Sequence, residues 1–341
     1  MPSSVPPSAP ERASIKDVAQ RAGVSRTTVS RVLSDAEAVR PALRERVQQA
    51  MAELGWRPSL AARRLRQRRT SLIGLVVADI RNPFFTAISR AVEDMAYAAG
   101  LRLILCNSDE DPAKERTYLE LMADERASGV ILAPTLEFTQ QHAPGPWPFP
   151  LVLVDRAPPG SATEAVLLDN VGAAAMLTRH LLDQGCRRIA LLAGARSTTG
   201  QQRQAGYEAA LRDAGLPPHV VALRPDAAAG EAGAARLLAG PAATRPDALL
   251  ATSGLLLLGA WRAVRAAGLA MPHALALAGF DDNDWTSMTE PAITVLAQPT
   301  DDIGRSAAEL LLQRLAEPAR APRRVVLQGR LLVRGSSLRS G

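Results

Sequence analysis

Residues 25–35, SRTTVSRVLSD, bring guanidinium and hydroxyl groups together at helical spacing. At 100° per residue, the apolar side chains Val29, Val32 and Leu33 fall within one arc of about 100°. The remaining surface carries polar groups, at Arg26, Thr27, Ser30 and Arg31. Arginine can donate two parallel hydrogen bonds to guanine, and threonine can contact a base or a phosphate. The segment therefore predicts a helix that buries one face and can read DNA with the other. A helical hairpin with a solvated basic face is the alternative.

A second group of polar side chains follows a series of predicted strands. Short apolar runs such as residues 71–79 and 151–155 end in carboxylates, amides or hydroxyls. These positions are Asp79, Asn107 to Asp109, Thr135, Asp155, Arg156, Thr252, Ser253, Asp281 and Asp282. Ligands of open parallel sheets bind outside the carboxyl ends of the strands. We therefore expect these side chains to surround a ligand site.

Two further helices are predicted beside the arginine-bearing helix. Residues 14–22 place apolar side chains at i, i+3, i+4 and i+7, after a serine N-cap with an aspartate three residues on. Gly23 stops this helix, and Ser25 caps the next one. A third helix is expected from Pro41 to the glycine at position 55. Three short helices with a tight glycine turn predict a helix-turn-helix domain over residues 14–57, whose second helix enters the major groove.

Residues 58–70 form an arginine-rich connection. Six arginines stand between positions 57 and 69, with Leu65 among them. A flexible basic tether is one interpretation. The other is a hinge helix that docks in the minor groove, where apolar side chains can wedge between base steps.

From residue 71 to residue 341, predicted strands and helices alternate. This order is typical of parallel sheets covered by helices on both faces. The length suits two doubly wound lobes with a cleft between them. The fold class is therefore an all-α headpiece followed by a two-lobed α/β domain.

Charge is placed unevenly along the 341 residues. Residues 1–70 contain 14 Lys or Arg against 6 Asp or Glu, whereas the whole chain contains 40 against 34. The positive excess of the first 70 residues indicates a polyanion partner for that part alone. Arginine bias in the composition is the alternative, but it does not explain the asymmetry.

Other sequence features indicate the cellular location of the protein. The two cysteines, Cys106 and Cys186, lie far apart and support neither a disulfide framework nor a metal cluster, which fits a reducing cytoplasm. Residues 1–13 are interpreted as a disordered tail rather than a secretion signal. The longest strongly apolar run, residues 255–261, is too short to cross a bilayer. We expect a soluble cytoplasmic protein without membrane contact.

Two other classes of protein compete with a DNA-binding regulator. The sequence lacks GxGxxG after the first strand and lacks GxxxxGK[ST], and its four histidines have no metal or triad spacing. Asp281 and Asp282 are a poor acid–base pair because adjacent residues of one strand point to opposite sides. An enzyme is therefore disfavoured, and no metal or cofactor is expected. A transported-sugar binding protein is disfavoured by the headpiece and the lack of a signal peptide.

The chain closely resembles the LacI-type family of bacterial transcription regulators. The resemblance runs from about residue 14 to residue 337. It is strongest in the motifs SIKDVAQRAGVSRTTVSRVL, RPSLAARRL, IRNPFF, CNSDEDPAKERTYLELM, RQAGYEAAL and GFDDNDW. The resemblance implies a body of the periplasmic-binding-protein-like type I fold. It also implies a homodimer that binds a palindromic operator on double-stranded DNA, most often as a repressor.

The resemblance also implies which residues contact DNA. Arg26, Thr27 and Arg31 would read bases, and Ser14, Ser25 and Thr28 would hold phosphates. Arg57 belongs to the same DNA-binding set. Leu65 occupies the position of the family's minor-groove wedge.

Effector contacts are implied at a third set of positions. These are Phe84, Phe85, Thr135, Asp155, Thr199, Arg203 and Asp281. Carboxylates and a guanidinium make paired hydrogen bonds to vicinal hydroxyls, and aromatic rings stack on sugar rings, so a sugar or sugar acid is expected. For each residue the alternative is a lobe-packing or strand-end capping role. The chain departs from the family at Arg40, where a helix cap is usual, and at Ser253 and Gly254, so the effector of one relative does not transfer.

Overall fold

The structure is a computed structural model, and it divides into two compact units, residues 1–70 and 71–341. It describes residues 13–34, 39–56, 70–140, 147–195, 197–241 and 243–339. Almost all of the predicted tail and of the predicted hinge segment lie outside these residues, and both remain predictions. No described helix is long and apolar enough to span a membrane.

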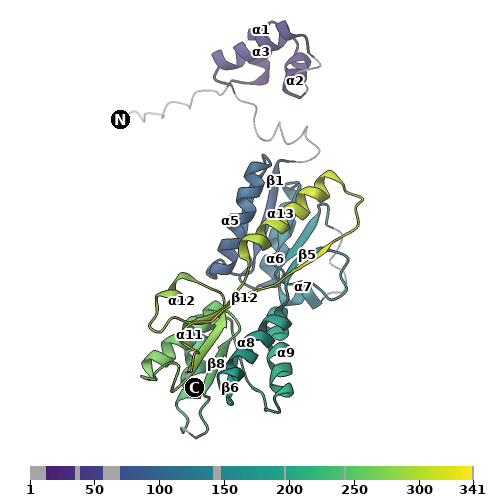
Figure 1. Cartoon of the computed structure of the whole chain (residues 1–341). Helices are drawn as coiled ribbons and strands as arrows, with labels where there is room; N and C mark the ends of the chain where they lie inside the picture. Colours follow the sequence, from purple (N-terminus) through teal and green to yellow (C-terminus); the bar gives the residue numbers. More distant parts are fainter. Residues whose placement is uncertain are drawn as a thin grey trace, which may run out of the picture. The chain divides into compact units, whose positions relative to one another are not determined.

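The described residues of the first unit form three helices, α1 (Ile15–Ala22), α2 (Arg26–Ser34) and α3 (Pro41–Glu53) (Figure 1). The predicted capping box is confirmed. The Asp17 N–H donates to Ser14 Oγ at 3.4 Å, and the Ser14 N–H donates to Asp17 Oδ2 at 2.8 Å. Gly23 then ends α1 in the left-handed region at a φ of 62°, where glycine has no Cβ to clash.

A small apolar core fixes the angles between these helices. Its centre is Val18, Val29 and Val47, each fully buried. The Arg46 guanidinium of α3 donates to the Ala22 carbonyl at 2.7 Å and so satisfies the carboxyl end of α1. The N-cap of α3 is Arg40, which makes no side-chain capping bond, as its residue type predicted.

The second unit begins with a lobe built on one parallel sheet, here called the amino-terminal lobe. Its strand order is β11-β5-β4-β3-β1-β2. The strands are β1 (Leu72–Val77), β2 (Arg102–Asn107), β3 (Gly129–Leu132), β4 (Leu151–Val154), β5 (Glu164–Leu168) and β11 (Arg324–Leu327). The helices of this lobe are α5 (Pro83–Ala98), α6 (Pro112–Asp124), α7 (Leu136–Gln140) and α13 (Thr300–Ala316).

The carboxyl-terminal lobe repeats this arrangement with the strand order β12-β10-β9-β8-β6-β7. Its strands are β6 (Ile189–Gly194), β7 (His219–Leu223), β8 (Ala248–Ala251), β9 (Ala276–Phe280), β10 (Thr294–Ala297) and β12 (Arg330–Leu332). Its helices are α8 (Asn170–Asp183), α9 (Thr198–Asp213), α10 (Ala227–Leu238), α11 (Gly254–Ala266) and α12 (Asp284–Met288). β12 pairs antiparallel with β10, so this sheet is not purely parallel as the sequence predicted.

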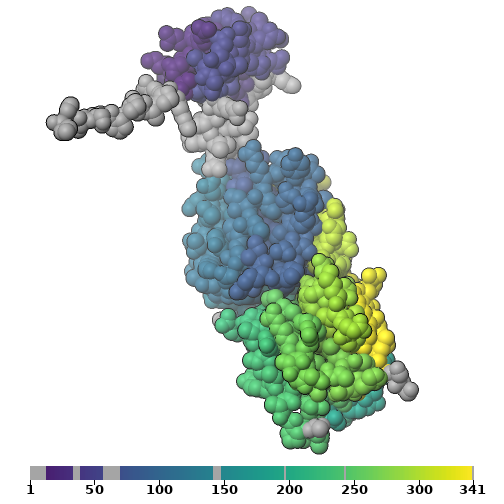
Figure 2. Space-filling model, turned by 90° about the vertical axis from the view of Figure 1, so that its left-hand side faces the viewer, coloured from purple at the N-terminus to yellow at the C-terminus, as the bar shows by residue number. Residues whose placement is uncertain are grey.

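The chain crosses between the lobes three times. It passes from β5 to α8, returns from β10 to α13, and passes again from β11 to β12. α13 packs on α5 of the amino-terminal lobe, where a Cβ at Gly304 would lie 2.6 Å from that of Ala91. In Figure 2 the yellow-green surface of α13 accordingly lies beside the blue amino-terminal lobe. Three short crossings leave the lobes free to change their mutual angle without breaking either sheet.

The predicted alternation of strands and helices is confirmed over most of the second unit. The strands β5, β7, β10, β11 and β12 were not among the predicted strands. Asp281 and Asp282 do not lie on one strand as assumed. β9 ends at Phe280, and Asp281 takes a left-handed φ of 76°.

We expect Gly259→Ala to destabilise the second unit, because α10 and α11 pack backbone to backbone there. A Cβ at Gly259 would lie 2.2 Å from the Ala227 carbonyl oxygen and 2.5 Å from the Glu231 nitrogen. Overpacking of this kind costs about 1–3 kcal/mol. Urea unfolding measures it. Gly240→Ala is the control, since its nearest neighbour would lie 3.7 Å away; equal loss in both variants would contradict this packing.

Candidate functional site

The exposed side of α2 carries the predicted base-reading residues. Arg26, Thr27 and Arg31 are exposed, while Val29 and Val32 are buried against the other helices. Ser25 accepts a hydrogen bond from the Thr28 N–H at 3.0 Å and so begins the helix. An exposed polar face on a helix held by a buried valine face suits insertion into a major groove.

Of the remaining predicted DNA contacts, the structure describes Ser14, Ser25 and Thr28. Ser14 is exposed, and its hydroxyl donates to Asp17 Oδ2 at 2.7 Å. The Ser25 and Thr28 hydroxyl oxygens lie 2.9 Å apart at the start of α2. Arg57 and Leu65 lie outside the described residues.

In the second unit, a cleft partly open to solvent lies at the carboxyl ends of strands from both lobes. The amino-terminal lobe contributes Asp79, Asn82, Phe84, Phe85, Glu110, Asp155 and Arg156. The carboxyl-terminal lobe contributes Gly194, Ser197, Thr199, Gly200, Arg203, Pro225, Thr252, Ser253, Leu255 and Asp281, and the second crossing contributes Gln298. This is the location expected for a ligand of a doubly wound sheet.

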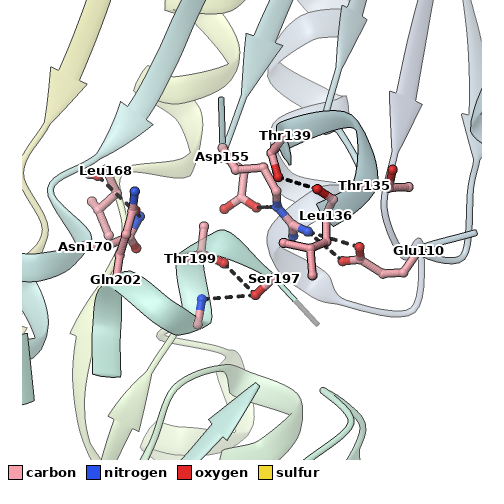
Figure 3. Close-up of polar contacts among 12 residues, drawn as sticks. Glu110, Thr135, Leu136, Thr139, Asp155, Leu168, Asn170, Ser197, Thr199 and Gln202 are labelled. Atoms are coloured by element: carbon pink, nitrogen blue, oxygen red, sulfur yellow. Dashed lines mark hydrogen bonds and ion pairs between the residues drawn. The ribbon is translucent and has the colours of Figure 1, made fainter. Parts of the chain in front are cut away.

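Six of the seven predicted effector residues line this cleft: Phe84, Phe85, Asp155, Thr199, Arg203 and Asp281. The seventh, Thr135, is not among the lining residues. It is buried, and its N–H and hydroxyl donate to the Glu115 carboxylate at 2.6 and 3.1 Å. Figure 3 shows Thr135 at the start of α7, with Asp155 and Thr199 closer to the centre of the view.

Two aspartates occupy matching positions in the two lobes. Asp155 follows β4 with a φ of 68°, and Asp281 follows β9 with a φ of 76°. Each N–H donates to the neighbouring strand, to the carbonyls of Val166 and Leu296. A left-handed backbone costs a non-glycine residue about 1–2 kcal/mol, and such strain often marks functional sites. The cleft thus receives one strained aspartate from each lobe.

Arg156 joins two carboxylates on the amino-terminal side of the cleft. Its Nε donates to Asp155 Oδ2 at 2.9 Å, and its NH1 donates to both oxygens of Glu110 at 2.9 and 3.0 Å (Figure 3). Only 5% of the Arg156 side chain is exposed. Burial alone would lower the pKa of Arg156, but the two carboxylates together raise it. The guanidinium is therefore fully charged and rigidly held.

Arg203 is the buried cation of the carboxyl-terminal side. Its Nε donates to Asn170 Oδ1 at 2.8 Å and its NH1 to the Thr252 carbonyl at 2.6 Å. Its guanidinium carbon lies 4.0 Å from the centroid of the Phe280 ring. Burial lowers the pKa of Arg203, and the nearby Asp281 and Asp155 oppose that fall. These two hydrogen bonds use only two of the five N–H donors of the guanidinium, and both partners are neutral. The guanidinium therefore keeps donors for a ligand.

Asp281 connects the cleft to the second crossing. Its Oδ2 accepts from the Gly254 N–H at 2.8 Å, and its Oδ1 accepts from Gln298 Nε2 at 2.6 Å. Asp282 does not line the cleft, and its carboxylate pairs with Arg334 at 2.7 Å. A change in the hydrogen bonds of Asp281 therefore acts directly on Gln298, which lies in the segment between β10 and α13.

Asp79, Arg156, Thr252 and Ser253 were predicted to surround a ligand as strand-end polar positions, and they line the cleft. Sequence reasoning missed Glu110 and Gln298. Gln298 directly follows β10, which was not among the predicted strands, and Glu110 lies three residues after the end of β2. Among the described residues, no group of three or more His, Cys, Asp or Glu side chains is arranged to hold a metal ion.

The sequence matches two known family models. The model of bacterial regulatory proteins of the lacI family covers residues 14–59, and the periplasmic binding protein-like domain covers residues 178–337. The HTH-type transcriptional regulator PtxS of Pseudomonas plecoglossicida is 34% identical over 96% of this chain and 96% of its own. The chain belongs to the LacI family.

Solved structures of LacI-family regulators share its fold. The complex of the transcriptional regulator CelR with cellobiose matches with a TM-score of 0.69 and 32% identity over 95% of this chain and 100% of that one. The lac repressor dimer bound to operator and the anti-inducer ONPF matches with a TM-score of 0.81 and 25% identity, over 96% and 100%. This LacI-family chain is a helix-turn-helix transcriptional regulator, and the named relatives are regulators rather than enzymes.

Glu115 gives the second unit a pH-dependent stability. Burial raises the pKa of Glu115 from 4.5 to about 7, and the hydrogen bonds from Thr135 only partly oppose this rise. The folded state therefore keeps a proton that the unfolded chain has already lost. Stability should fall as pH rises from about 4.5 to about 7, by up to about 3 kcal/mol, and then level off.

Glu115→Gln should remove this part of the pH dependence, because the amide cannot ionise and still bonds to Thr135. Urea unfolding between pH 5 and pH 8 would show the variant gaining stability over the wild type as pH rises. Glu120→Gln, on the exposed side of the same helix, is the control. Parallel pH profiles for Glu115→Gln and the wild type would refute the assignment.

Proposed function

We propose that this regulator is a repressor whose operator affinity is controlled by a sugar or sugar acid bound in the cleft. The observation that carries the proposal is the composition of the cleft. Two aromatic rings, Phe84 and Phe85, stand beside Asp155 from one lobe and Arg203 and Asp281 from the other. Aromatic faces suit the apolar face of a sugar ring, and charged groups bind its hydroxyls with short hydrogen bonds. The cellobiose bound to CelR supports the same class of ligand.

The two lobes provide the coupling between ligand and DNA. A sugar that binds Asp155 and Asp281 together favours one angle between the lobes, and the three crossings absorb the change. The segment at residues 58–70 connects the amino-terminal lobe to the DNA-binding helices in sequence, and a hinge helix so short is marginal without partners. Effector binding thus changes how the two hinge segments of a dimer are held. A coupling free energy of about 1–3 kcal/mol is typical.

A homodimer on a palindromic operator completes the proposal. The lac repressor, which shares this fold, was solved as a dimer bound to operator DNA, and this supports the same assembly for the chain. Because the bacterial chromosome lies in the cytoplasm, the regulator would act there.

Arg26→Ala should weaken operator binding without changing effector affinity. Loss of a base-reading arginine costs about 1–3 kcal/mol and relaxes sequence preference at the base it contacts. Fluorescence anisotropy with a duplex selected from a randomised palindromic library measures the change. Arg236→Ala, an exposed arginine of α10, controls for net charge. A uniform loss on all sequences, equal in both variants, would contradict base reading by Arg26.

Arg203→Gln should give the opposite result. Titration calorimetry with a panel of sugars and sugar acids should show at least tenfold weaker binding, about 1.4 kcal/mol, because the ligand loses a buried charged donor. Operator affinity without ligand should stay within about twofold, since Arg203 does not belong to the first unit. Arg212→Gln, exposed at the end of the same helix, is the control. Intact ligand binding by a folded Arg203→Gln variant would remove this residue from the site.

A further inference from the structure

The polar lining of the cleft contains more carboxylates than guanidiniums. The carboxylates are Asp79, Glu110, Asp155 and Asp281, and the guanidiniums are Arg156 and Arg203. The Asp79 carboxylate already pairs with the exposed Arg81, with Nε to Oδ1 at 2.9 Å. The other three face two guanidiniums, so the cleft presents an excess of negative charge to its ligand.

Glu110 is the carboxylate that makes the negative charges of the cleft outnumber the positive ones. It lies in the loop after β2, next to Asp109, and both residues have left-handed φ values, 57° and 54°. The Glu110 N–H donates to the Ala78 carbonyl at 3.0 Å, which anchors the loop to the end of β1. This strained, anchored loop directs the Glu110 carboxylate onto the NH1 of Arg156.

The two carboxylates saturate the charge of Arg156. Asp155 occupies its Nε and Glu110 its NH1, and the Arg156 side chain is nearly inaccessible. A ligand carboxylate would therefore have to displace Glu110 to pair with Arg156. Arg203, the other cation, is near both Asp155 and Asp281, which compensate its charge. A ligand carboxylate could accept hydrogen bonds from Arg203, but it would add negative charge to a cleft in which three carboxylates already face two guanidiniums. A buried charge without a counter-charge is strongly unfavourable.

We propose that Glu110 is a specificity-determining residue, which cancels the charge of Arg156 so that the cleft accepts neutral sugars and rejects sugars bearing a carboxylate. This inference rests on the proposed sugar-binding function and narrows its ligand class. The sugar hydroxyls donate to Asp155 and Asp281, which only accept hydrogen bonds. A neutral ring supplies these donors and adds no charge.

The experiment compares neutral sugars with their acids on the wild type and on Glu110→Gln. Titration calorimetry uses the pairs D-glucose with D-glucuronate, D-galactose with D-galacturonate, and cellobiose with cellobionate, together with D-ribose. In Glu110→Gln the amide oxygen still accepts from Arg156, but the negative charge is gone. Asp109→Asn is the matched control, because it removes the neighbouring charge, which pairs with Lys114 and does not line the cleft.

The wild type should bind at least one neutral sugar and bind its acid at least tenfold more weakly. In a folded Glu110→Gln variant the ratio of acid to neutral affinity should rise at least tenfold, and Asp109→Asn should leave the ratio as in the wild type. A sugar acid that binds the wild type as tightly as its neutral parent would overturn this inference but not the proposed function. An unchanged ratio of acid to neutral affinity in Glu110→Gln would have the same consequence. If no sugar of either kind binds at about 10 mM, the proposed function fails and this inference fails with it.

Discussion

Asp155 and Asp281 bring like charges into one cleft from opposite lobes, and much of the surrounding structure compensates them. Arg156 neutralises Asp155 from within its own lobe, whereas Asp281 is held by the Gly254 N–H and by Gln298. Arg203 is buried close to both carboxylates and donates to neutral groups. Because a buried carboxylate is tolerated only with such partners, the two aspartates dictate which residues stand around the ligand.

This arrangement also explains how a small ligand can act at a distance. Asp281 receives its hydrogen bond from Gln298, which lies in the crossing between β10 and α13. Asn170, which accepts from Arg203, begins α8 directly after the first crossing. The groups that we propose to bind the ligand are thus hydrogen-bonded to segments that cross between the lobes. Under this proposal, a ligand that changes these bonds acts directly on the crossings, and no long relay through either core is needed.

Local sequence signals predicted the three described helices of the first unit. The Ser14–Asp17 capping box, the glycine stop at Gly23 and the valine face of α2 act within a few residues, so a single sequence reveals them. The alternation of buried strands and helices predicted the two lobes for the same reason. Glu110 and the antiparallel β12 depend on contacts across more than thirty residues of sequence, with Arg156 and with β10, and Gln298 depends on its contact with Asp281. Periodicity does not encode these contacts. Thr135 was predicted both from its place after a strand and from the resemblance, but its hydrogen bonds to Glu115 hold it off the cleft wall.

The backbone strain around the cleft indicates that the side-chain contacts needed there, rather than stability, determine which residues follow these strand ends. Of the five described non-glycine residues with positive φ, four follow strand ends on the cleft side: Asp109, Glu110, Asp155 and Asp281. Glycine would adopt each of these conformations without the Cβ clash and would relieve about 1–2 kcal/mol at each. It would also remove the three carboxylates that line the cleft. A strained acidic residue at the end of a parallel strand is therefore best explained by what its side chain must contact.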